Sequence, residues 1–368
     1  MFRIPKPSRL LRLCIGRQQV PPNTLREVEQ VLVNYDLGHW QLVRPLLGGR
    51  SSDNFCLRTD RGPKVLKKYR WSVLSITQEH SILRYLNDTD FPFPRLTPNR
   101  GGDTRTELNG KYYAIYDFID GFRYDEYYMP ARIEHRLIAQ AAETLAHLHQ
   151  LMEGFVAENR TVDGFTPDGE RLLRDTAWHL DALDRFVQGT SRNSPNSLEA
   201  LVRRNLDKLR HDLADSGHWH EQIHLQWPKL VIHNDYVAKN IVFDSNGLAG
   251  VLDFRGAVLD LRAADMARAL QSFARQGRYG LDAHKARTFL KAYQTRIPLP
   301  DDEVALVPKL LRWRLLRFAI RHLQSRLPST HQRASFYDRW AQACWLEENE
   351  SRFLDALLSK RASTAMRS

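Results

Sequence analysis

The sequence predicts an α+β protein in two parts, a small sheet-plus-helix part followed by a larger and mainly helical part. Two observations carry this prediction. Short β-branched and aromatic runs separated by glycine-containing turns are concentrated between residues 41 and 118, whereas helical periodicity prevails after residue 124. With 368 residues, of which 42% are hydrophobic, the chain is long enough to bury a sizeable core.

Composition narrows the class of protein. The formal net charge is +11, and the three cysteines are widely spaced, which disfavours a disulfide framework or a zinc site and is typical of a reducing compartment. No apolar run reaches about 18 residues, so no transmembrane helix is expected. Residues 1–26 carry six basic residues and no acidic one. Because this segment lacks a long apolar stretch and a cleavage site, we expect a flexible basic arm over residues 1–23 and a cytoplasmic protein.

The first part of the chain is predicted to begin with a helix and to continue with three strands. Thr24-x-x-Glu27 has the form of a capping box, which predicts a helix from Thr24 to about Tyr35. Three strands are expected between residues 41 and 69. The turn after the first strand contains small and amide residues that permit the backbone to approach a phosphate closely, namely Gly48, Gly49, Ser52 and Asn54.

The elements that follow are mostly helical. Residues 71–86 predict a helix that carries Glu79, and residues 111–118 predict a strand rich in aromatic side chains. Further helices are expected near residues 133–151, 164–187, 197–214, 263–276, 284–295, 302–326 and 335–360, with a loop at 216–221.

One stretch, residues 231–254, carries the functional prediction. Asn246-Gly247 separates two β-branched, apolar runs, and this dipeptide predicts a hairpin with a two-residue turn. With that turn, Asn240 and Asp253 fall opposite each other on one face of the hairpin, with Cβ atoms about 5 Å apart. Asp235 precedes the hairpin, with four residues between it and Asn240.

These three side chains are of the kind that phosphoryl transfer requires. An aspartate can accept or orient the proton of an acceptor hydroxyl, and this role is expected of Asp235. Hard oxygen ligands hold Mg²⁺ on nucleotide phosphates, and Asn240 and Asp253 are the expected ligands. The alternative is a solvated hairpin with polar ends, and the agreement of three positions with an independently placed turn disfavours it.

The stretch resembles the catalytic loop of the aminoglycoside phosphotransferase and choline kinase superfamily, whose pattern is H-x-D-x-x-x-x-N followed by a hydrophobic strand ending in D-F or D-W. The positions of that pattern are occupied by His233, Asp235, Asn240 and Asp253. Asp265-Met266-Ala267 stands where the family has Asp-Leu-Ala. The overall sequence is most similar in appearance to the type II homoserine kinase branch, and the resemblance covers roughly residues 36–318.

The resemblance implies a protein-kinase-like bilobal fold, with an N-terminal nucleotide-binding lobe over residues 24–116 and a C-terminal lobe over 117–368. It implies ATP and Mg²⁺ as cofactors. Lys67 matches the family's strand lysine, with the adjacent Lys68 as competitor on the other strand face, and Glu79 would pair with that lysine. An exposed helical carboxylate is the alternative for Glu79. Backbone groups of Asp117 to Ile119, in the inter-lobe linker, would meet adenine.

Two residues depart from the family pattern. Asn234 replaces the usual glycine, and Arg255 follows the D-F pair at a position where aspartate, glutamate or glycine is common in the family. Arg255 could shift acceptor preference towards anionic groups or pair with a nearby carboxylate, and pairing is favoured. A late helix carries Arg314, Arg317 and Arg321 on one face. A nucleic-acid surface is one interpretation, but packing, ion pairing or recognition of a substrate carboxylate by Arg317 is favoured.

The predicted function is ATP-dependent transfer of the γ-phosphoryl group to a hydroxyl of a small polar metabolite that is homoserine-, amino-alcohol- or aminoglycoside-like. A protein Ser/Thr kinase of the same superfamily is the first alternative. A nucleotide-binding regulator without catalysis is the second, and a nucleic-acid-binding module ranks last. The expected partner is a small-molecule hydroxyl acceptor, without membrane association.

Overall fold

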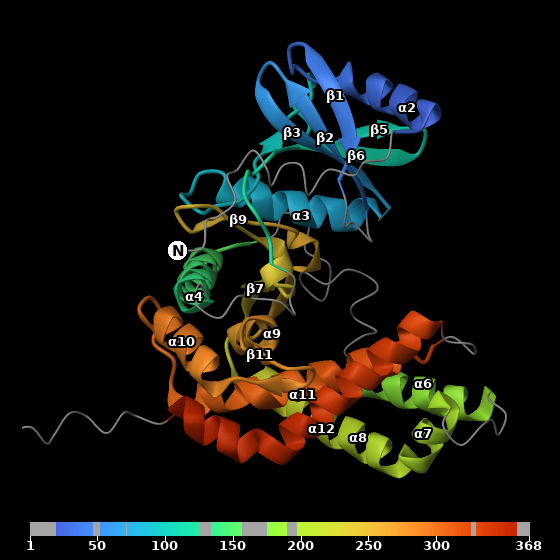
Figure 1. The fold of residues 1–368 in the computed structure, drawn as a ribbon, viewed down its shortest axis with the longest axis vertical. Helices are drawn as coiled ribbons and strands as arrows, with labels where there is room; N and C mark the ends of the chain where they lie inside the picture. Colours follow the sequence, from blue (N-terminus) through green and yellow to red (C-terminus); the bar gives the residue numbers. More distant parts are fainter. Residues whose placement is uncertain are drawn as a thin grey trace, which may run out of the picture. The chain divides into compact units, whose positions relative to one another are not determined.

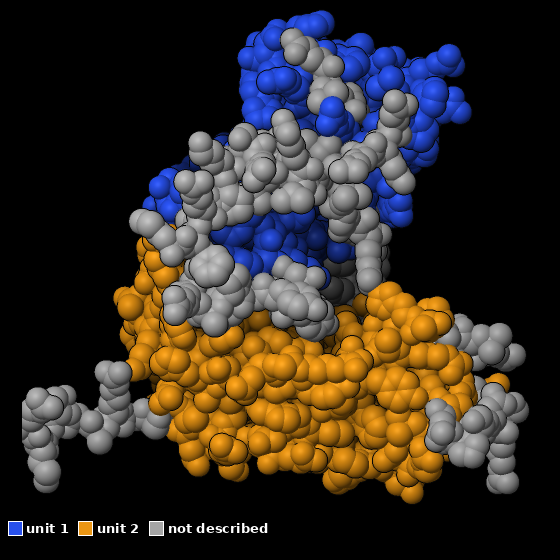
Figure 2. Space-filling model, viewed as in Figure 1, with its two compact units in different colours: residues 1–125, 154–160, 238–257 blue, residues 126–153, 161–237, 258–368 orange. Residues whose placement is uncertain are grey.

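The computed structural model describes residues 20–46, 52–70, 72–124, 134–156, 175–189, 197–324 and 329–358 (Figure 1). The chain divides into two compact units (Figure 2): unit 1 comprises residues 1–125, 154–160 and 238–257, and unit 2 comprises 126–153, 161–237 and 258–368. The arm predicted over residues 1–23 lies almost entirely outside the described residues. The lobe boundary at residue 117 stays a prediction. Unit 1 also contains the hairpin after Asp235, at residues 238–257, although the chain before and after it belongs to unit 2.

Unit 1 is built on an antiparallel sheet in the order β1-β2-β3-β6-β4, with β5 paired to β6. Its elements are α2 (Pro22–Leu32), β1 (Trp40–Pro45), β2 (Ser52–Thr59), β3 (Gly62–Tyr69), α3 (Val73–Leu86), β4 (Leu96–Thr97), β5 (Thr106–Leu108), β6 (Lys111–Asp117), the 3-10 turns η1 (Ala238–Asn240) and η2 (Phe254–Gly256), β8 (Ile241–Phe243) and β9 (Leu248–Val251). The three strands expected between residues 41 and 69 and the helix carrying Glu79 are therefore confirmed.

Helix α2 begins differently from the prediction. It starts at Pro22, after Pro21, and has no side-chain cap; proline suits this position because its missing N–H needs no partner and its φ is already helical. The predicted capping box is wrong, because the Glu27 carboxylate accepts hydrogen bonds from Lys68 and Tyr113 instead. Burial acts to raise the pKa of Glu27, but these bonds and one from Lys111 lower it to about 2.

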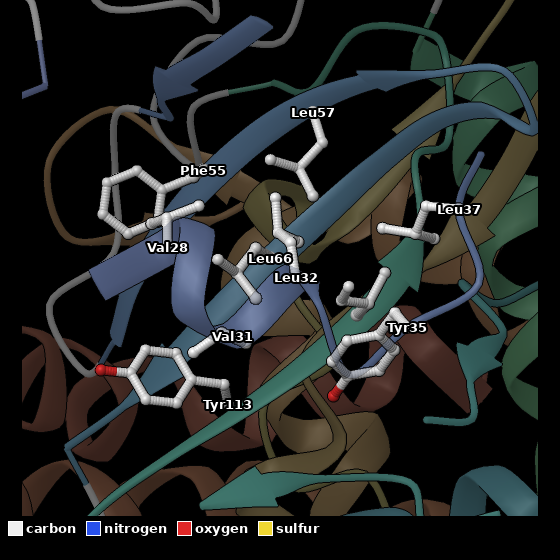
Figure 3. Close-up of a cluster of buried hydrophobic side chains, with 10 residues drawn as sticks. Val28, Val31, Leu32, Tyr35, Leu37, Phe55, Leu57, Leu66 and Tyr113 are labelled. Carbon is white, nitrogen blue, oxygen red and sulfur yellow. The ribbon is translucent and has the colours of Figure 1, made fainter. Parts of the chain in front are cut away.

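Among the described residues of unit 1, α2 and α3 cover opposite faces of the sheet. Figure 3 shows the apolar side chains of α2 packed on one face, and the cluster comprises Val28, Val31, Leu32, Tyr35, Leu37, Phe55, Leu57, Leu66, Tyr113 and Ile115. Each fully buried aliphatic side chain of this kind contributes about 1.5–3 kcal/mol. Because successive strand residues point to opposite faces, Leu66 and Lys68 face α2, whereas Lys67 and Tyr69 face α3, where they contact Glu79 and His80.

The hairpin β8–β9 exists as predicted, but its register differs. Ile241 pairs with Val251 and Phe243 with Leu248, with a register shift after Val242. The Asp244 carboxylate accepts hydrogen bonds from the amides of Asn246 and Gly247 at 2.7 and 3.0 Å. This Asx turn moves the reversal one residue towards the N-terminus of the predicted turn, so the prediction that Asn240 and Asp253 form a cross-strand pair is wrong. The partner of Asn240 is Leu252, whose amide donates to the Asn240 carbonyl at 2.8 Å.

The segment after β6 packs closely on this hairpin. Phe122 and Phe243 exchange two backbone hydrogen bonds of 2.8 and 2.9 Å. Gly121 has a φ of 151°, and a Cβ there would lie 2.3 Å from the carbonyl oxygen of Phe243. Only glycine permits this approach, which fixes the sheet of unit 1 to the hairpin that carries Asn240 and Asp253.

Unit 2 is mainly helical. Its elements are α4 (Glu134–Met152), α6 (Thr176–Gly189), α7 (Leu198–Arg204), α8 (Leu206–Gln226), β7 (Leu230–Ile232), β10 (Val258–Asp260), α9 (Arg262–Phe273), β11 (Arg275–Gln276), β12 (Gly280–Leu281), α10 (Ala283–Gln294), α11 (Asp301–Arg321) and α12 (Thr330–Leu358). The loop predicted at residues 216–221 is wrong, because α8 continues through it and buries Ser216 and His220. Among the described helices, none combines the length and apolar composition that a membrane span requires.

Candidate active site

Lys67 and Glu79 form a buried ion pair in unit 1. The Lys67 Nζ atom lies 2.9 and 3.1 Å from the two carboxylate oxygens of Glu79, and the side chains are 12% and 3% exposed. The ammonium also lies 5.0 Å from the ring centre of Tyr69. Lys68, the alternative candidate, pairs with Glu27 on the other sheet face. The alternation of β3 side chains thus selects Lys67 as the lysine that faces α3.

The positions of the other residues predicted to contact nucleotide do not test that prediction. Gly48 and Gly49 lie outside the described residues. Ser52 is buried and donates to the Asn54 side chain at 3.1 Å. The Asp117 amide donates to the Arg95 carbonyl at 2.9 Å, so an adenine held by residues 117–119 would need other backbone groups. The nucleotide roles of these residues stay predictions.

Asn240 and Asp253 stand at the open end of the hairpin, within the same unit as the Lys67–Glu79 pair. Asn240 ends η1 and is 8% exposed. Asp253 adopts the left-handed conformation, with φ 66° and ψ 66°, directly before η2. Such a conformation is uncommon for a residue with a side chain and often marks a functional position. The two residues are not a cross-strand pair. The amide of Leu252, which precedes Asp253, donates a hydrogen bond to the carbonyl of Asn240, so Asn240 and Asp253 lie at the same end of the hairpin.

The Asp253 carboxylate has the properties expected of a metal ligand. Its Oδ1 atom is buried and accepts no hydrogen bond from the described residues, and the Nε atom of Arg255 lies 3.6 Å away. A buried carboxylate oxygen without a donor is costly unless a further cation satisfies it. The charge of Asp253 also contributes, after burial and Glu79, to raising the pKa of the buried Tyr116.

The donor set fits Mg²⁺ held together with nucleotide phosphates. Mg²⁺ commonly takes one or two protein oxygens and completes its shell with phosphate oxygens and water. Asn240 and Asp253 would supply the amide and carboxylate oxygens. Within the described ranges, no group of three or more histidine, cysteine, aspartate or glutamate side chains is arranged as an all-protein metal site.

The loop that carries Asp235 belongs to unit 2, and Asp265 fixes its backbone. The two carboxylate oxygens of Asp265 accept hydrogen bonds from the amides of His233 and Asn234, both at 2.7 Å. Asp265 is fully buried, which strengthens these charge-assisted bonds. The Asp235 amide donates to Nδ1 of His233 at 3.3 Å. The start of α9 thus sets the path of the chain immediately before Asp235.

His149 supports Asp265 from α4. Its Nε2 atom lies 3.3 Å from Oδ2 of Asp265, and its Nδ1 atom lies 2.6 Å from the hydroxyl of Tyr293. Both His149 and Asp265 are buried. The residue therefore has structural partners from α9 and α10.

Asn234 adopts φ 62°, which explains why glycine is usual at this position. Asparagine tolerates this region better than most residues. Arg314, from α11, donates to its side-chain oxygen at 2.7 Å and to its carbonyl at 3.1 Å. The departure from the family pattern is therefore matched by an arginine eighty residues further along the chain.

Arg268 contacts Asp235 directly, which the sequence analysis did not predict. Its Nε and Nη2 atoms lie 3.1 and 2.7 Å from Oδ1 of Asp235. A signal was available: Arg268 follows Asp265 by three residues on α9, so both side chains leave the same helix face, and Asp265 already contacts the loop. The predicted arginines lie elsewhere, Arg255 beside Asp253 and Arg317 over the ring of Trp313 at 5.0 Å.

An antiparallel sheet with a lysine–glutamate pair to a neighbouring helix, joined to a mainly helical unit with an aspartate loop, defines a protein-kinase-like phosphotransferase. Comparison with known proteins agrees. Residues 42–299 match the family described as "Phosphotransferase enzyme family". The homoserine kinase of Rhodospirillum rubrum is 31% identical over 298 residues, which cover 79% of this chain and 83% of that protein. The chain belongs to the phosphotransferase enzyme family.

Solved structures show the same fold at low sequence identity. An aminoglycoside phosphotransferase from Alicyclobacillus acidocaldarius superposes with a TM-score of 0.62 at 16% identity, covering 92% of this chain and 98% of that one. An amicoumacin kinase, solved in complex with AMP-PNP, Ca²⁺ and Ami, superposes with a TM-score of 0.61 at 14% identity, covering 89% of this chain and 94% of that one. The predicted fold and superfamily are confirmed, and the chain is an ATP-dependent kinase that acts on a hydroxyl group.

Proposed function

We propose that this kinase phosphorylates the hydroxyl of a small amino-alcohol-like metabolite, with homoserine as the first acceptor to test. The relatives with about 30% identity over most of the chain are homoserine kinases, and the solved kinases of this fold include one for aminopropanol. The observation that carries the catalytic part of the proposal is the Lys67–Glu79 pair, which lies in one compact unit with Asn240 and Asp253. ATP and Mg²⁺ are the proposed cofactors.

Lys67 has the chemistry to bind nucleotide phosphates. Its ammonium is nearly buried, and Glu79 holds it in one place at the sheet face. A positioned cation stabilises the charge on transferring phosphates without reorganisation during the reaction. Asn240 and Asp253 would hold Mg²⁺, which supplies neutralisation of the phosphate charge when it is bound.

Asp235 is the proposed base. The acceptor hydroxyl oxygen would form a bond to the γ-phosphorus as the bond to the bridging oxygen of ADP breaks, and its proton would pass to the Asp235 carboxylate. For this role the carboxylate must be held in a fixed orientation. Asp265 supports that requirement by fixing the amides of His233 and Asn234, and Arg268 does so at the carboxylate itself.

The test is an acceptor screen on the purified, full-length chain. ATP consumption would be measured with homoserine, other amino alcohols, aminoglycosides and generic protein substrates, and phosphorylated products would be identified by mass spectrometry. We expect Mg²⁺-dependent transfer to a small hydroxyl compound. Transfer to protein substrates alone would favour the protein kinase alternative, and nucleotide binding without any transfer would favour a regulator.

A further inference from the structure

Arg268 and Asp235 form a charge pair at the place where the acceptor hydroxyl must approach. Two guanidinium nitrogens, Nε and Nη2, contact a single carboxylate oxygen, Oδ1, at 3.1 and 2.7 Å. The Arg268 side chain is 12% exposed and that of Asp235 is 31% exposed. The base is therefore accessible from one side, with an almost buried guanidinium against it.

The position of this guanidinium is fixed from a second direction. Its Nη1 atom donates to the side-chain oxygen of Gln271 at 2.8 Å, and the Gln271 amide donates to Gln342 of α12 at 2.9 Å. Arg275 donates to the same Gln342 oxygen at 3.3 Å. Gln342 itself is buried. Arg268 is therefore part of a polar chain between α9 and α12, and its charge is held in place beside Asp235.

An acceptor whose hydroxyl reaches Asp235 must also lie beside Arg268. A hydroxyl in hydrogen-bond contact with the carboxylate places the carbon that bears it within about 4–7 Å of the guanidinium, because the hydrogen-bond lengths are fixed. A substituent two or three bonds further along the acceptor can then turn towards the guanidinium. At such distances, and in a partly buried site, the guanidinium offsets the repulsion between the Asp235 carboxylate and an anionic substituent, and it removes the attraction that the unpaired carboxylate would have for a cationic one. A planar guanidinium also matches the two oxygens of a carboxylate.

From this geometry we propose that Arg268 is a specificity-determining residue, which selects acceptors that carry a carboxylate or another anionic group near the reacting hydroxyl. The inference rests on the proposed function and narrows its acceptor class. Arg314 adds a second positive charge to the same loop through Asn234. Amino alcohols without an anionic group and polycationic aminoglycosides are then poor acceptors.

The first experiment compares four acceptors that differ in charge but share a primary hydroxyl: homoserine, its carboxamide, 3-amino-1-propanol and 4-hydroxybutyrate. Steady-state kinetics on the intact enzyme should give a kcat/KM for homoserine at least tenfold above that of the carboxamide and of 3-amino-1-propanol. Equal values, or a preference for the acceptors without a carboxylate, would overturn the inference. This comparison needs no variant, so a folding defect cannot obscure it.

The second experiment uses Arg268→Gln, with Arg268→Lys as the conservative variant. Arg268→Gln should raise the KM for homoserine at least tenfold. It should also reduce the ratio of kcat/KM for homoserine to that for 3-amino-1-propanol to within about threefold, and Arg268→Lys should restore part of this ratio. Arg275→Gln is the matched control, because Arg275 joins the same polar chain through Gln342; its acceptor ratio should be that of the wild type. If Arg268→Gln lowered kcat for all acceptors by one factor and left the ratio unchanged, Arg268 would only position Asp235.

A binding measurement separates failure of this inference from failure of the proposed function. Homoserine and 4-hydroxybutyrate, in the presence of Mg²⁺ and a non-hydrolysable ATP analogue, should raise the melting temperature of the wild type and not that of Arg268→Gln. Wild-type activity confined to acceptors without an anionic group would reject the inference and leave the kinase standing. Absence of transfer to any acceptor would reject the proposed function, and an unselective melting shift would then reject the inference as well.

Discussion

Arg314 donates two hydrogen bonds to Asn234, one to the side-chain oxygen at 2.7 Å and one to the carbonyl at 3.1 Å. The Asn234 amide donates a hydrogen bond to Oδ1 of Asp265 at 2.7 Å. A residue with φ 62° is thus held by a cation from α11 and an anion from α9. The next residue in the chain is Asp235, so these two contacts fix the direction in which the proposed base leaves the loop.

Replacement of Asn234 should separate backbone conformation from the contact with Arg314. Asn234→Ala removes the side-chain acceptor and places alanine in the left-handed region, which costs roughly 1–2 kcal/mol for the conformation and about 1 kcal/mol for the bond. Asn234→Gly loses the bond but accepts the conformation, so its loss should be about 1 kcal/mol. Melting temperature and kcat measure both effects. Equal stability of the two variants would show that φ at this residue is not a constraint.

Asp235→Ala should lower kcat at least a hundredfold and leave the KM for ATP close to that of the wild type. The reason is that a base acts on the hydroxyl in the transition state and makes no direct contribution to nucleotide binding. Asp244→Ala is a useful control, since Asp244 caps the hairpin turn. A variant that kept more than a tenth of wild-type turnover would disprove the assignment of Asp235.

Asp253→Asn and Asn240→Ala should both increase the Mg²⁺ concentration needed for half-maximal activity at fixed ATP. We expect the larger effect, tenfold or more, for Asp253→Asn, because the carboxylate carries the charge that attracts the cation. The titration is repeated with Mn²⁺ to distinguish loss of a ligand from loss of folding. An unchanged metal requirement in Asp253→Asn would remove this residue from the metal site.

Lys67→Met should raise the KM for ATP at least tenfold and reduce kcat, because it removes the cation that Glu79 positions. Lys68→Met is the matched control. Its ammonium contacts Glu27 on the opposite sheet face, so it should lower stability and leave the KM for ATP unchanged. Kinetics and thermal unfolding of both variants test the pair. A comparable rise in the KM for ATP in Lys68→Met would contradict the assignment of the phosphate-binding role to Lys67.

Acidification should destabilise the protein between pH 6.5 and 5 because of two buried histidines. Burial lowers the pKa of His80 to about 3, and it lowers that of His179 to about 4 against an opposing hydrogen bond with the Asp175 carbonyl. Both are neutral when folded and take up protons on unfolding below the ordinary value of 6.5. Stability is therefore full above pH 6.5 and falls by about 2 kcal/mol per histidine down to pH 5.

Denaturant unfolding at several pH values measures this slope. His80→Gln should flatten it, and the exposed His39→Gln is the control. Glu27 does not contribute in this window, because its pKa is lowered from 4.5 to about 2 and its stabilisation is lost only below pH 4.5. A slope that is unchanged in His80→Gln would exclude that histidine as a cause.

Short-range patterns determined much of unit 1. Strand alternation was enough to place Lys67 and Lys68 on opposite faces of one strand, because side chains on a strand alternate with a fixed period of two. The resemblance to the family implied that Lys67 is the lysine that pairs with Glu79. The chemistry of residues 231–254 was enough to predict the family. Asn246-Gly247 correctly predicted a hairpin but not its register, since Asp244 competes for the same turn amides through an Asx turn that the sequence pattern does not rank.

The sequence by itself thus determined the two-part α+β architecture, because periodicity and turn chemistry act between residues close in the chain. The chemistry of residues 231–254 indicated the class of reaction, and the resemblance to a known family implied the kinase-like fold and the lysine–glutamate pair. Only the tertiary structure decided which cations surround Asp235. Arg268 and Arg314 reach this loop from helices 33 and 80 residues further on, while Arg255 and Arg317, which the sequence favoured, lie against Asp253 and Trp313. A guanidinium on a long side chain takes its partner from the packing of helices, and that packing depends on contacts between distant parts of the chain.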